Sequence, residues 1–410
     1  MHMPSPDSLP NAVPNRPVPS GAPIGVPVRP DGARPLDVLL ISEDPRWTAS
    51  VREAVAAEGG VVETVSARAA VARLASAGTH LSHVLVDQNG DEGLLGTLAE
   101  LTSDTASAEV TLLILGSPSD AYPAPRIIAS ADRQSVAASL AIRHFPAGHN
   151  EPTLAASELL DVVSGEMIET RYQPIVRMAD RVTTAVEVLA RLNHPIHGAV
   201  TPDWFVPRFE DAGLSFTLTD LVSTRALADL VGAHFRGIGI AMALNYPLKV
   251  LSHPEAAASL DKRRASLGLA PEQVQIELTE SRPVEDFAAL GRSLEHLRAR
   301  GYRISIDDVG PAVKNLDRLL TLPFTGLKLD KGIVRMIGTP GPGASLAPRV
   351  IEQARDRGLD VVAEGVETRE MWDRLRALGV QEAQGYFIAR PLPAAAVPVW
   401  LEAWRTTTDG

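Results

Sequence analysis

The stretch Ile304-Ser305-Ile306-Asp307-Asp308-Val309-Gly310 places two adjacent carboxylates at the end of a short apolar run that a glycine follows. Such a run predicts a buried strand that stops at the two acids. Carboxylates this close repel each other unless a cation lies between them. On its own, the stretch is more typical of a strand end whose acids face solvent or cap a helix. Its interpretation therefore depends on whether the pattern recurs.

The pattern recurs along the second half of the chain. Short apolar runs follow one another after Arg171, most of them separated by about 10–25 residues with helical spacing. The eight runs are Tyr172–Val176, Thr184–Leu189, Ile238–Leu244, Val274–Leu278, Arg303–Ile306, Gly326–Leu329, Asp360–Ala363 and Ala383–Ile388. Eight such units predict a (β/α)8 TIM-like barrel over residues 171–408.

Each run carries, or ends at, a polar residue that a buried strand does not favour. These residues are Gln173, Glu187, Asn245, Glu277, Asp307, Asp308, Lys328, Glu364 and Gln384. In such a barrel the carboxyl ends of the strands meet at one mouth. Oxygen donors without His or Cys favour magnesium, manganese or calcium over zinc. A multi-acid mouth indicates one or two divalent cations, an arrangement that serves phosphodiester cleavage. For any single acid, the alternative is an ion pair with an arginine.

The preceding part of the chain shows a different rhythm. From Leu36, strands alternate with helices up to about residue 147, which predicts a parallel sheet covered on both faces. We expect strands at residues 36–42, 61–65, 83–86 and 110–115, with helices at about 45–58 and 67–77. Residues 1–35 hold ten prolines and predict a disordered leader. Residues 148–170 predict a linker helix leading into the barrel.

Composition limits the functions that the chain could have. Its 410 residues are too many for one compact core. The absence of cysteine excludes disulfides, a thiolate nucleophile and a Cys-based zinc site. The formal charge of -11 argues against a DNA-binding surface. No apolar run is long enough to span a membrane and the N-terminus is not a signal peptide, so we expect a cytoplasmic protein.

The segment 36–147 resembles the phosphoacceptor receiver domain of response regulators, a flavodoxin-like, doubly wound fold. By this resemblance Glu43 and Asp44 match the acidic pair that holds magnesium, Asp87 matches the phosphorylated aspartate, and Ser117 matches the hydroxyl that contacts the phosphoryl group. The family also uses a lysine, and the first 248 residues contain none. Two alternatives stay open: a working receiver that a sensor kinase phosphorylates, and a degenerate receiver used for dimerisation or partner docking.

Residues 155–405 resemble the EAL family of bacterial phosphodiesterases, which hydrolyse cyclic di-GMP to linear pGpG. The motifs occur in order along the chain. They are Tyr172-Gln173-Pro174-Ile175-Val176, Glu187-Val188-Leu189-Ala190-Arg191-Leu192-Asn193-His194-Pro195, Asn245, Glu277-Leu278-Thr279-Glu280-Ser281, Asp307-Asp308-Val309-Gly310, Lys328-Leu329-Asp330, Ala363-Glu364-Gly365-Val366-Glu367-Thr368 and Gln384-Gly385-Tyr386.

The resemblance implies a role for each matching residue. Glu187, Asn245, Glu277 and Asp307 would hold a first Mg²⁺ or Mn²⁺, and Asp307, Asp308 and Glu364 a second. Lys328 would orient or help deprotonate the attacking water, so Lys328, Glu364 and Glu187 are the catalytic candidates. Gln173, Arg191, Asp330 and Gln384 would contact the substrate, and Glu280 would anchor the loop after Asp308. Calcium is expected to compete as an inhibitor. Both resemblances imply a homodimer.

Two positions depart from the family pattern. Val188 replaces the alanine of the Glu-Ala-Leu motif that gives the family its name, a mild change. After the aspartate pair the family usually has Phe-Gly-Thr-Gly, whereas this chain has Val309-Gly310-Pro311-Ala312, which changes the allowed backbone angles. The leading hypothesis is a metal-dependent cyclic di-GMP phosphodiesterase. The alternatives are a cyclic di-GMP receptor or scaffold without useful turnover, and a docking protein that does neither.

Overall fold

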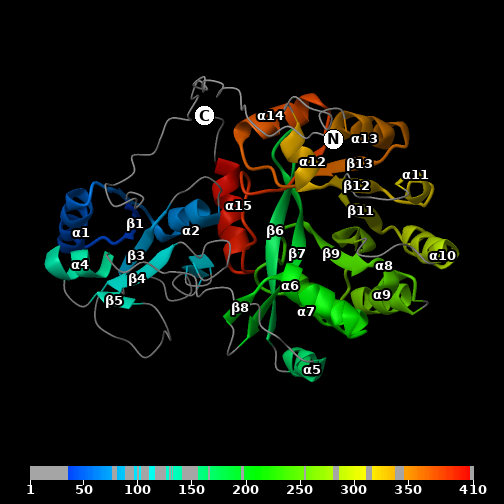
Figure 1. Cartoon of the computed structure of the whole chain (residues 1–410), viewed down its shortest axis with the longest axis horizontal. Coiled ribbons are helices and arrows are strands. Elements are labelled where there is room, and N and C mark those ends of the chain that lie inside the picture. The colour runs from blue at the N-terminus through cyan, green and yellow to red at the C-terminus, as the bar shows by residue number, and fades with distance from the viewer. Residues whose placement is uncertain are drawn as a thin grey trace, which may run out of the picture.

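The chain forms two α/β domains that lie side by side (Figure 1). The computed structural model describes residues 36–75, 81–87, 97–98, 101–102, 110–115, 126–128, 131, 133–140, 156–164, 167–194, 198–253, 255–279, 286–310, 316–337 and 346–406. The predicted disordered leader 1–35, together with Ser117, Glu280 and residues 311–315, lies outside this described part.

The first domain is a parallel sheet in the order β2-β1-β3-β4-β5. Its strands are β1 (Asp37–Ile41), β2 (Val61–Thr64), β3 (His83–Asp87), β4 (Thr111–Leu115) and β5 (Arg126–Ile128), and its helices are α1 (Pro45–Ala57), α2 (Ala67–Ala75) and α4 (Arg133–Leu140). Alternate residues of β1 point to opposite faces, so Leu40 packs with α1 whereas Leu39 joins the core on the α2 side. The predicted doubly wound, flavodoxin-like sheet is confirmed.

The second domain is a closed barrel. Its strands are β6 (Ile168–Arg177), β7 (Thr183–His194), β8 (Gly198–Val200), β9 (Ala241–Pro247), β10 (Val274–Thr279), β11 (Arg303–Val309), β12 (Gly326–Leu329), β13 (Asp360–Ala363) and β14 (Glu382–Ala383). The order β6-β14-β13-β12-β11-β10-β9-β7 closes on itself through pairing of β6 with β7, and β8 extends β7 on the outside. The predicted TIM-like barrel is thus confirmed, with two differences in detail.

The first difference concerns β6, which is antiparallel to both of its neighbours, β7 and β14. The first two barrel strands therefore form a hairpin rather than a βα unit, because a few residues at Asp180 suffice to reverse the chain. The second difference concerns the predicted strand Ala383–Ile388. Only Glu382–Ala383 pairs as β14, because the chain turns at Gly385 and the amide of Ile388 bonds back to the Gly385 carbonyl.

Helices surround the barrel on its outside (Figure 1). They are α5 (Ala156–Ser164), α6 (Pro202–Asp211), α7 (Ser215–Val231), α8 (Leu248–Leu251), α9 (Ala256–Ser266), α10 (Phe287–Arg298), α11 (Leu316–Leu319), α12 (Lys331–Met336), α13 (Leu346–Asp356), α14 (Arg369–Ala377) and α15 (Ala396–Thr406), with the 3-10 turn η2 (Pro271–Gln273). The predicted linker helix 148–170 is wrong at its end. Ile168 continues the apolar spacing but pairs with Leu192 as the start of β6.

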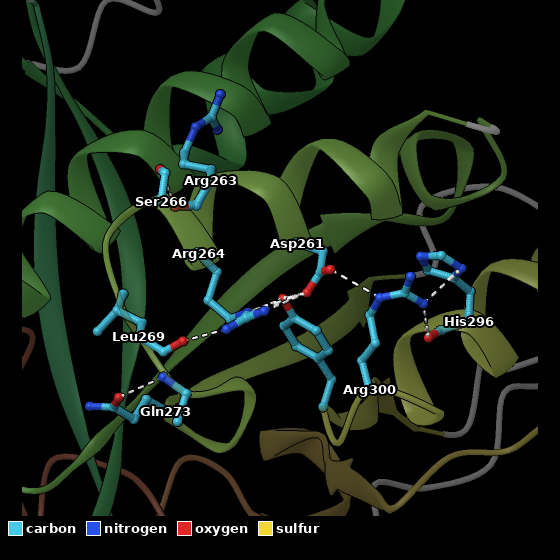
Figure 2. Close-up of polar contacts among 10 residues, drawn as sticks. Asp261, Arg263, Arg264, Ser266, Leu269, Gln273, His296 and Arg300 are labelled. Atoms are coloured by element: carbon cyan, nitrogen blue, oxygen red, sulfur yellow. Dashed lines mark hydrogen bonds and ion pairs between the residues drawn. The ribbon is translucent and has the colours of Figure 1, made fainter.

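A polar network fastens helix α9 to the strand ends opposite the barrel mouth (Figure 2). The buried hydroxyl of Tyr302, just before β11, donates to Asp261 at 2.9 Å and accepts from Arg264 Nε at 2.9 Å. Arg264 also bonds the carbonyl of Leu269, which precedes β10, and Arg300 pairs with Asp261 at 3.0 Å. These contacts lie at the amino ends of β10 and β11, so their role is stability.

We expect Tyr302→Phe to lower the free energy of unfolding of the barrel by about 1–3 kcal/mol, because it leaves Asp261 and Arg264 each one partner short in a half-buried place. Urea unfolding of the barrel measures the loss, with Thr321→Ala on the exposed surface as the control. An unchanged midpoint for Tyr302→Phe would contradict this account.

Candidate metal and nucleotide site

Successive barrel strands each place one polar side chain at the mouth. Glu187 comes from β7, Asn245 from β9, Glu277 from β10, Asp307 from β11 and Lys328 from β12. The strand register sets Glu277 directly beside Asn245. Because the strands close into a ring, side chains that are far apart in sequence converge on one point. Glu187, Glu277, Asp307 and Lys328 are all buried.

The acids form two overlapping groups. Carboxylate oxygens of Glu187, Glu277 and Asp307 lie within 4.8 Å of one another, and so do those of Asp307, Asp308 and Glu364. Asp307 belongs to both groups. These are the carboxylates that the sequence predicted for two neighbouring cations with a shared aspartate.

A β-bulge places the two adjacent aspartates. The pairing of β11 with β12 shifts register between Ile306 and Val309, so neither Asp307 nor Asp308 has a ladder partner there. Asp308 adopts a left-handed backbone with φ of 53°, and its N–H donates to Asp307 Oδ1 at 2.9 Å. Without the bulge, adjacent strand residues would face opposite sides of the barrel wall. The bulge therefore lets both carboxylates take part in one site, at the cost of local backbone strain.

The Lys328 ammonium lies among four of the carboxylates. Its Nζ is 2.6 Å from Glu364, 2.9 Å from Glu277, 3.2 Å from Asp307 and 3.5 Å from Glu187. The lysine is fully buried, and a buried charge is stable only when it is paired. One positive charge faces four potential negative charges, so the cluster keeps an excess of acid that suits a divalent cation.

Burial and crowding shift the ionisation of these groups. Burial raises the pKa of Asp307 to about 6 and that of Glu364 to about 8, although Lys328 opposes both shifts. Burial also raises the pKa of Glu277. It acts on Glu187 in the same direction, but the Lys328 ammonium and two side-chain amides outweigh it and lower the pKa of that carboxyl. Burial alone would lower the pKa of Lys328, yet the surrounding carboxylates raise it well above its usual range.

Three side-chain amides complete the floor of the site. Asn245 Nδ2 donates to Glu187 Oε1 at 2.9 Å. Gln384 Nε2 donates to Glu187 and to Gln173 Oε1, the latter at 2.9 Å. These bonds fix the orientation of the buried Gln384, whose Oε1 has no hydrogen-bond partner among the described residues. An unsatisfied buried acceptor beside excess carboxylates fits a site for a hard cation with its water ligands.

A cavity of about 690 Å³ opens above this floor, a volume suited to a small-molecule ligand. The sequence analysis missed several of its lining residues. They include Asp203 and Glu210 of α6 and Lys331 and Arg335 of α12, whereas Glu367, Gly385 and Tyr386 lie within the family motifs but had no predicted role. Lys331 and Arg335 are four residues apart directly after β12, so their helical spacing behind a strand end could have indicated them. Helix α6 carries no comparable signal.

Two predicted substrate contacts, Arg191 and Asp330, are not among the described residues that line this cavity. The guanidinium of Arg191 bonds the carbonyl of Ala190 at 2.9 Å. Asp330 caps helix α12, where its carboxylate accepts from the N–H of Gly332 at 2.7 Å. Their roles in substrate binding stay predictions.

The first domain places its predicted acids differently. Asp44 caps helix α1 and is bound by the Arg46 guanidinium at 2.7 Å, and this side-chain bond holds the pKa of Asp44 below its usual range. The Asp87 carboxylate accepts from the Ser42 hydroxyl at 2.9 Å. Among the described residues, the groups of acids that lie close enough together to hold a metal ion do not include Glu43, Asp44 or Asp87. A guanidinium thus lies on the carboxylate that the resemblance assigned to magnesium.

The model of the EAL domain matches residues 156–391, which is more than half of the chain, so the chain belongs to the EAL domain family. The cyclic di-GMP phosphodiesterase NbdA of Pseudomonas aeruginosa is 33% identical over 249 residues, covering 60% of this chain and 32% of NbdA. The cyclic di-GMP phosphodiesterase RocR of the same organism is 28% identical over 387 residues, covering 87% of this chain and 96% of RocR.

A solved structure also matches the barrel. The PaMucR phosphodiesterase in complex with c-di-GMP superposes with a TM-score of 0.55 at 30% identity, covering 59% of this chain and 98% of that chain. The chain spans about a third of the length of NbdA and of other large relatives, but nearly all of RocR. Throughout the described part of the chain, every helix is too short or too polar to cross a lipid bilayer.

We expect Lys328→Met to destabilise the metal-free protein by about 3–5 kcal/mol, because it leaves four carboxylates without their shared counter-charge. Saturating Mn²⁺ should then raise the melting temperature more in Lys328→Met than in the wild type. The matched control is Lys331→Met, which removes an exposed ammonium at the cavity rim. Differential scanning fluorimetry in EDTA and in Mn²⁺ measures both effects, and equal stability of Lys328→Met and wild type in EDTA would contradict the assignment.

The metal-free protein should lose stability as the pH rises from about 4.5 to 8. In the folded chain Glu364 holds its proton up to about pH 8, whereas in the unfolded chain it releases it near 4.5, so rising pH in this window favours unfolding. Melting temperatures in EDTA should fall across this range, and less so in Glu364→Gln. With Mn²⁺ the trend should reverse, because metal ligands bind as carboxylates. If the melting temperatures of Glu364→Gln and of the wild type in EDTA fell equally with pH, the raised pKa of Glu364 would be contradicted.

Proposed function

We propose that this chain hydrolyses cyclic di-GMP to linear pGpG. The observation that carries the proposal is the pair of overlapping carboxylate groups that share Asp307 at the floor of a 690 Å³ cavity, in a chain of the EAL domain family. Relatives named as cyclic di-GMP phosphodiesterases and the c-di-GMP complex of a similar barrel support the choice of substrate.

The position of each residue suggests its role in the proposed reaction. Glu187, Asn245, Glu277 and Asp307 would hold one Mg²⁺ or Mn²⁺, and Asp307, Asp308 and Glu364 a second. Bound there, such ions stabilise charge on a phosphodiester and supply a nucleophile at neutral pH. Lys328 lies among the carboxylates, where its ammonium fixes their orientation and holds a proton next to Glu364. Gln173 and Gln384 would orient the ligand from the floor of the cavity, next to Glu187.

A cyclic di-GMP receptor without turnover is the second candidate. The sequence Val309-Gly310-Pro311-Ala312 favours it, because proline restricts the loop that follows the bulged aspartates. Small displacements of ligand residues reduce the reaction rate strongly, while binding persists. We further propose a homodimer and a regulatory role for the first domain. The Arg46 guanidinium pairs with the Asp44 carboxylate, which the resemblance assigned to magnesium. We therefore favour docking of a protein partner on the first domain over phosphorylation of Asp87.

The proposal predicts that the purified full chain converts cyclic di-GMP to pGpG with Mn²⁺ or Mg²⁺. Glu364→Gln should lower kcat at least about 100-fold, since it removes a predicted ligand of the second cation. The matched control is Asp360→Asn, which changes a carboxylate at the start of β13, the strand that Glu364 follows. Asp360 pairs with Arg303 at 2.9 Å, and its substitution should keep kcat within about threefold. Chromatography of the nucleotide product measures the rates.

Three outcomes separate the candidates. Product that Glu364→Gln abolishes supports the enzyme, and replacement of Mn²⁺ by Ca²⁺ should then suppress it while binding persists. Tight binding of cyclic di-GMP without product supports the receptor. Absence of both binding and product would contradict both candidates.

A further inference from the structure

In the described part of the chain, the largest contact between the two domains is made by one helix from each. Helix α2 of the first domain packs against α15, the last helix of the barrel (Figure 1). The buried residues Val71, Leu74 and Ala75 of α2 belong to one continuous apolar core with Trp400 of α15. At the surface of the same contact, an ion pair joins α2 to α15 at 2.7 Å. The first domain is therefore docked on the barrel through a shared core.

One peptide group connects this interface to the cavity. The last described residue of helix α2 is Ala75, whose carbonyl accepts a hydrogen bond from the N–H of Arg390 at 2.5 Å. The carbonyl of Ala389 belongs to the same peptide group, and it accepts from Gln173 Nε2 at 3.0 Å. A trans peptide group is rigid and planar, with its N–H and C=O directed to opposite sides. Movement of Ala75 would therefore move this peptide group and, with it, the Gln173 side chain bonded to its carbonyl.

The neighbouring contacts stiffen the connection. Leu392 pairs with Tyr172 through two backbone hydrogen bonds, at 2.7 and 2.9 Å. These bonds tie the segment after Arg390 to β6, the strand that carries Gln173. Gln173 is buried, lines the cavity and accepts from Gln384. If α2 withdrew, the Ala75 carbonyl and the Arg390 N–H would both lose the bond that joins them.

We propose that docking of α2 on the barrel sets the position of Gln173 through the Ala389–Arg390 peptide group, and thereby controls how tightly the cavity holds its nucleotide ligand. The inference rests on the proposed function, since it names a control on the same cavity. The carboxylates of Glu277, Asp307 and Glu364 are held by the Lys328 ammonium and not by this peptide group. Docking should therefore change ligand affinity and KM more than kcat.

The test loosens one face of the first domain at a time. Leu74→Ala removes side-chain volume from the core shared with the barrel, whereas Leu40→Ala removes the same atoms from the face that packs on α1. We expect Leu74→Ala to weaken binding of cyclic di-GMP in Ca²⁺ about fivefold or more, and Leu40→Ala to change it less than about twofold. With Mn²⁺, kcat should stay within about twofold in both. Isothermal titration and initial rates measure these effects.

A double-mutant cycle tests the route through Gln173. If α2 acts through this side chain, Leu74→Ala should have no further effect on affinity in a Gln173→Ala background. A positioning role predicts this non-additivity, whereas general destabilisation predicts that the two effects add. Additive effects, or equal weakening by Leu74→Ala and Leu40→Ala, would overturn the inference.

A second set of variants avoids the core and the risk of misfolding. Arg68 and Glu402 form the exposed ion pair between α2 and α15. Arg68→Glu and Glu402→Arg each place like charges across the interface, and the double swap restores the attraction. We expect each single variant to weaken binding about two- to fivefold and the double variant to recover it. Failure of the double variant to recover wild-type affinity would count against docking as the cause.

The outcomes for this inference and for the proposed function are distinguishable. A wild-type chain that does not bind cyclic di-GMP would overturn the proposed function, and the first titration shows this before any variant is compared. Wild-type binding that neither Leu74→Ala nor the charge variants change would overturn the inference alone.

Discussion

The structure depends on the balance between one buried ammonium and the carboxylates around it. Lys328 is fully buried within 3.5 Å of Glu187, Glu277, Asp307 and Glu364. Desolvation of so many acids is tolerable only with compensating positive charge, and a single lysine compensates for part of it. Burial, together with the neighbouring carboxylates, raises the pKa of Glu364 to about 8, and the remaining excess of acid makes the mouth of the barrel receptive to further cations. Stability of the empty barrel and affinity for metal are thus opposed at the same groups.

The barrel makes this balance possible because closure brings strand ends together, but closure alone does not place every group. The bulge in β11 turns Asp308 toward the site occupied by Asp307, at a left-handed φ of 53°. The antiparallel β6 brings Gln173 beside Glu187, with which it pairs in register. The short β14 gives way to the turn at Gly385, which places Gln384 next to both. Each irregularity of the barrel contributes a group to the lining of the cavity.

Much of the fold and of the acid cluster could be predicted from the sequence. Apolar runs that end in acids mark strands, and parallel strands in a closed barrel converge, so Glu187, Glu277 and Asp307 could be grouped without coordinates. Strand direction could not be predicted for β6, because apolar alternation is the same for parallel and antiparallel pairs. Local side-chain contacts could not be predicted either: Asp330 follows a strand end, and its carboxylate caps helix α12. The pairing of Arg46 with Asp44 depends on a rotamer that spacing does not specify.

Carboxylates from separate strands meet at the barrel mouth, where we propose that they hold two neighbouring divalent cations. Anomalous diffraction from crystals grown with Mn²⁺ would locate these cations. We expect two manganese peaks about 3.5–4 Å apart, one bounded by Glu187, Glu277 and Asp307 and the other by Asp307, Asp308 and Glu364. Crystals that show no manganese at these carboxylates, with Lys328 still paired to all four acids, would contradict this proposal.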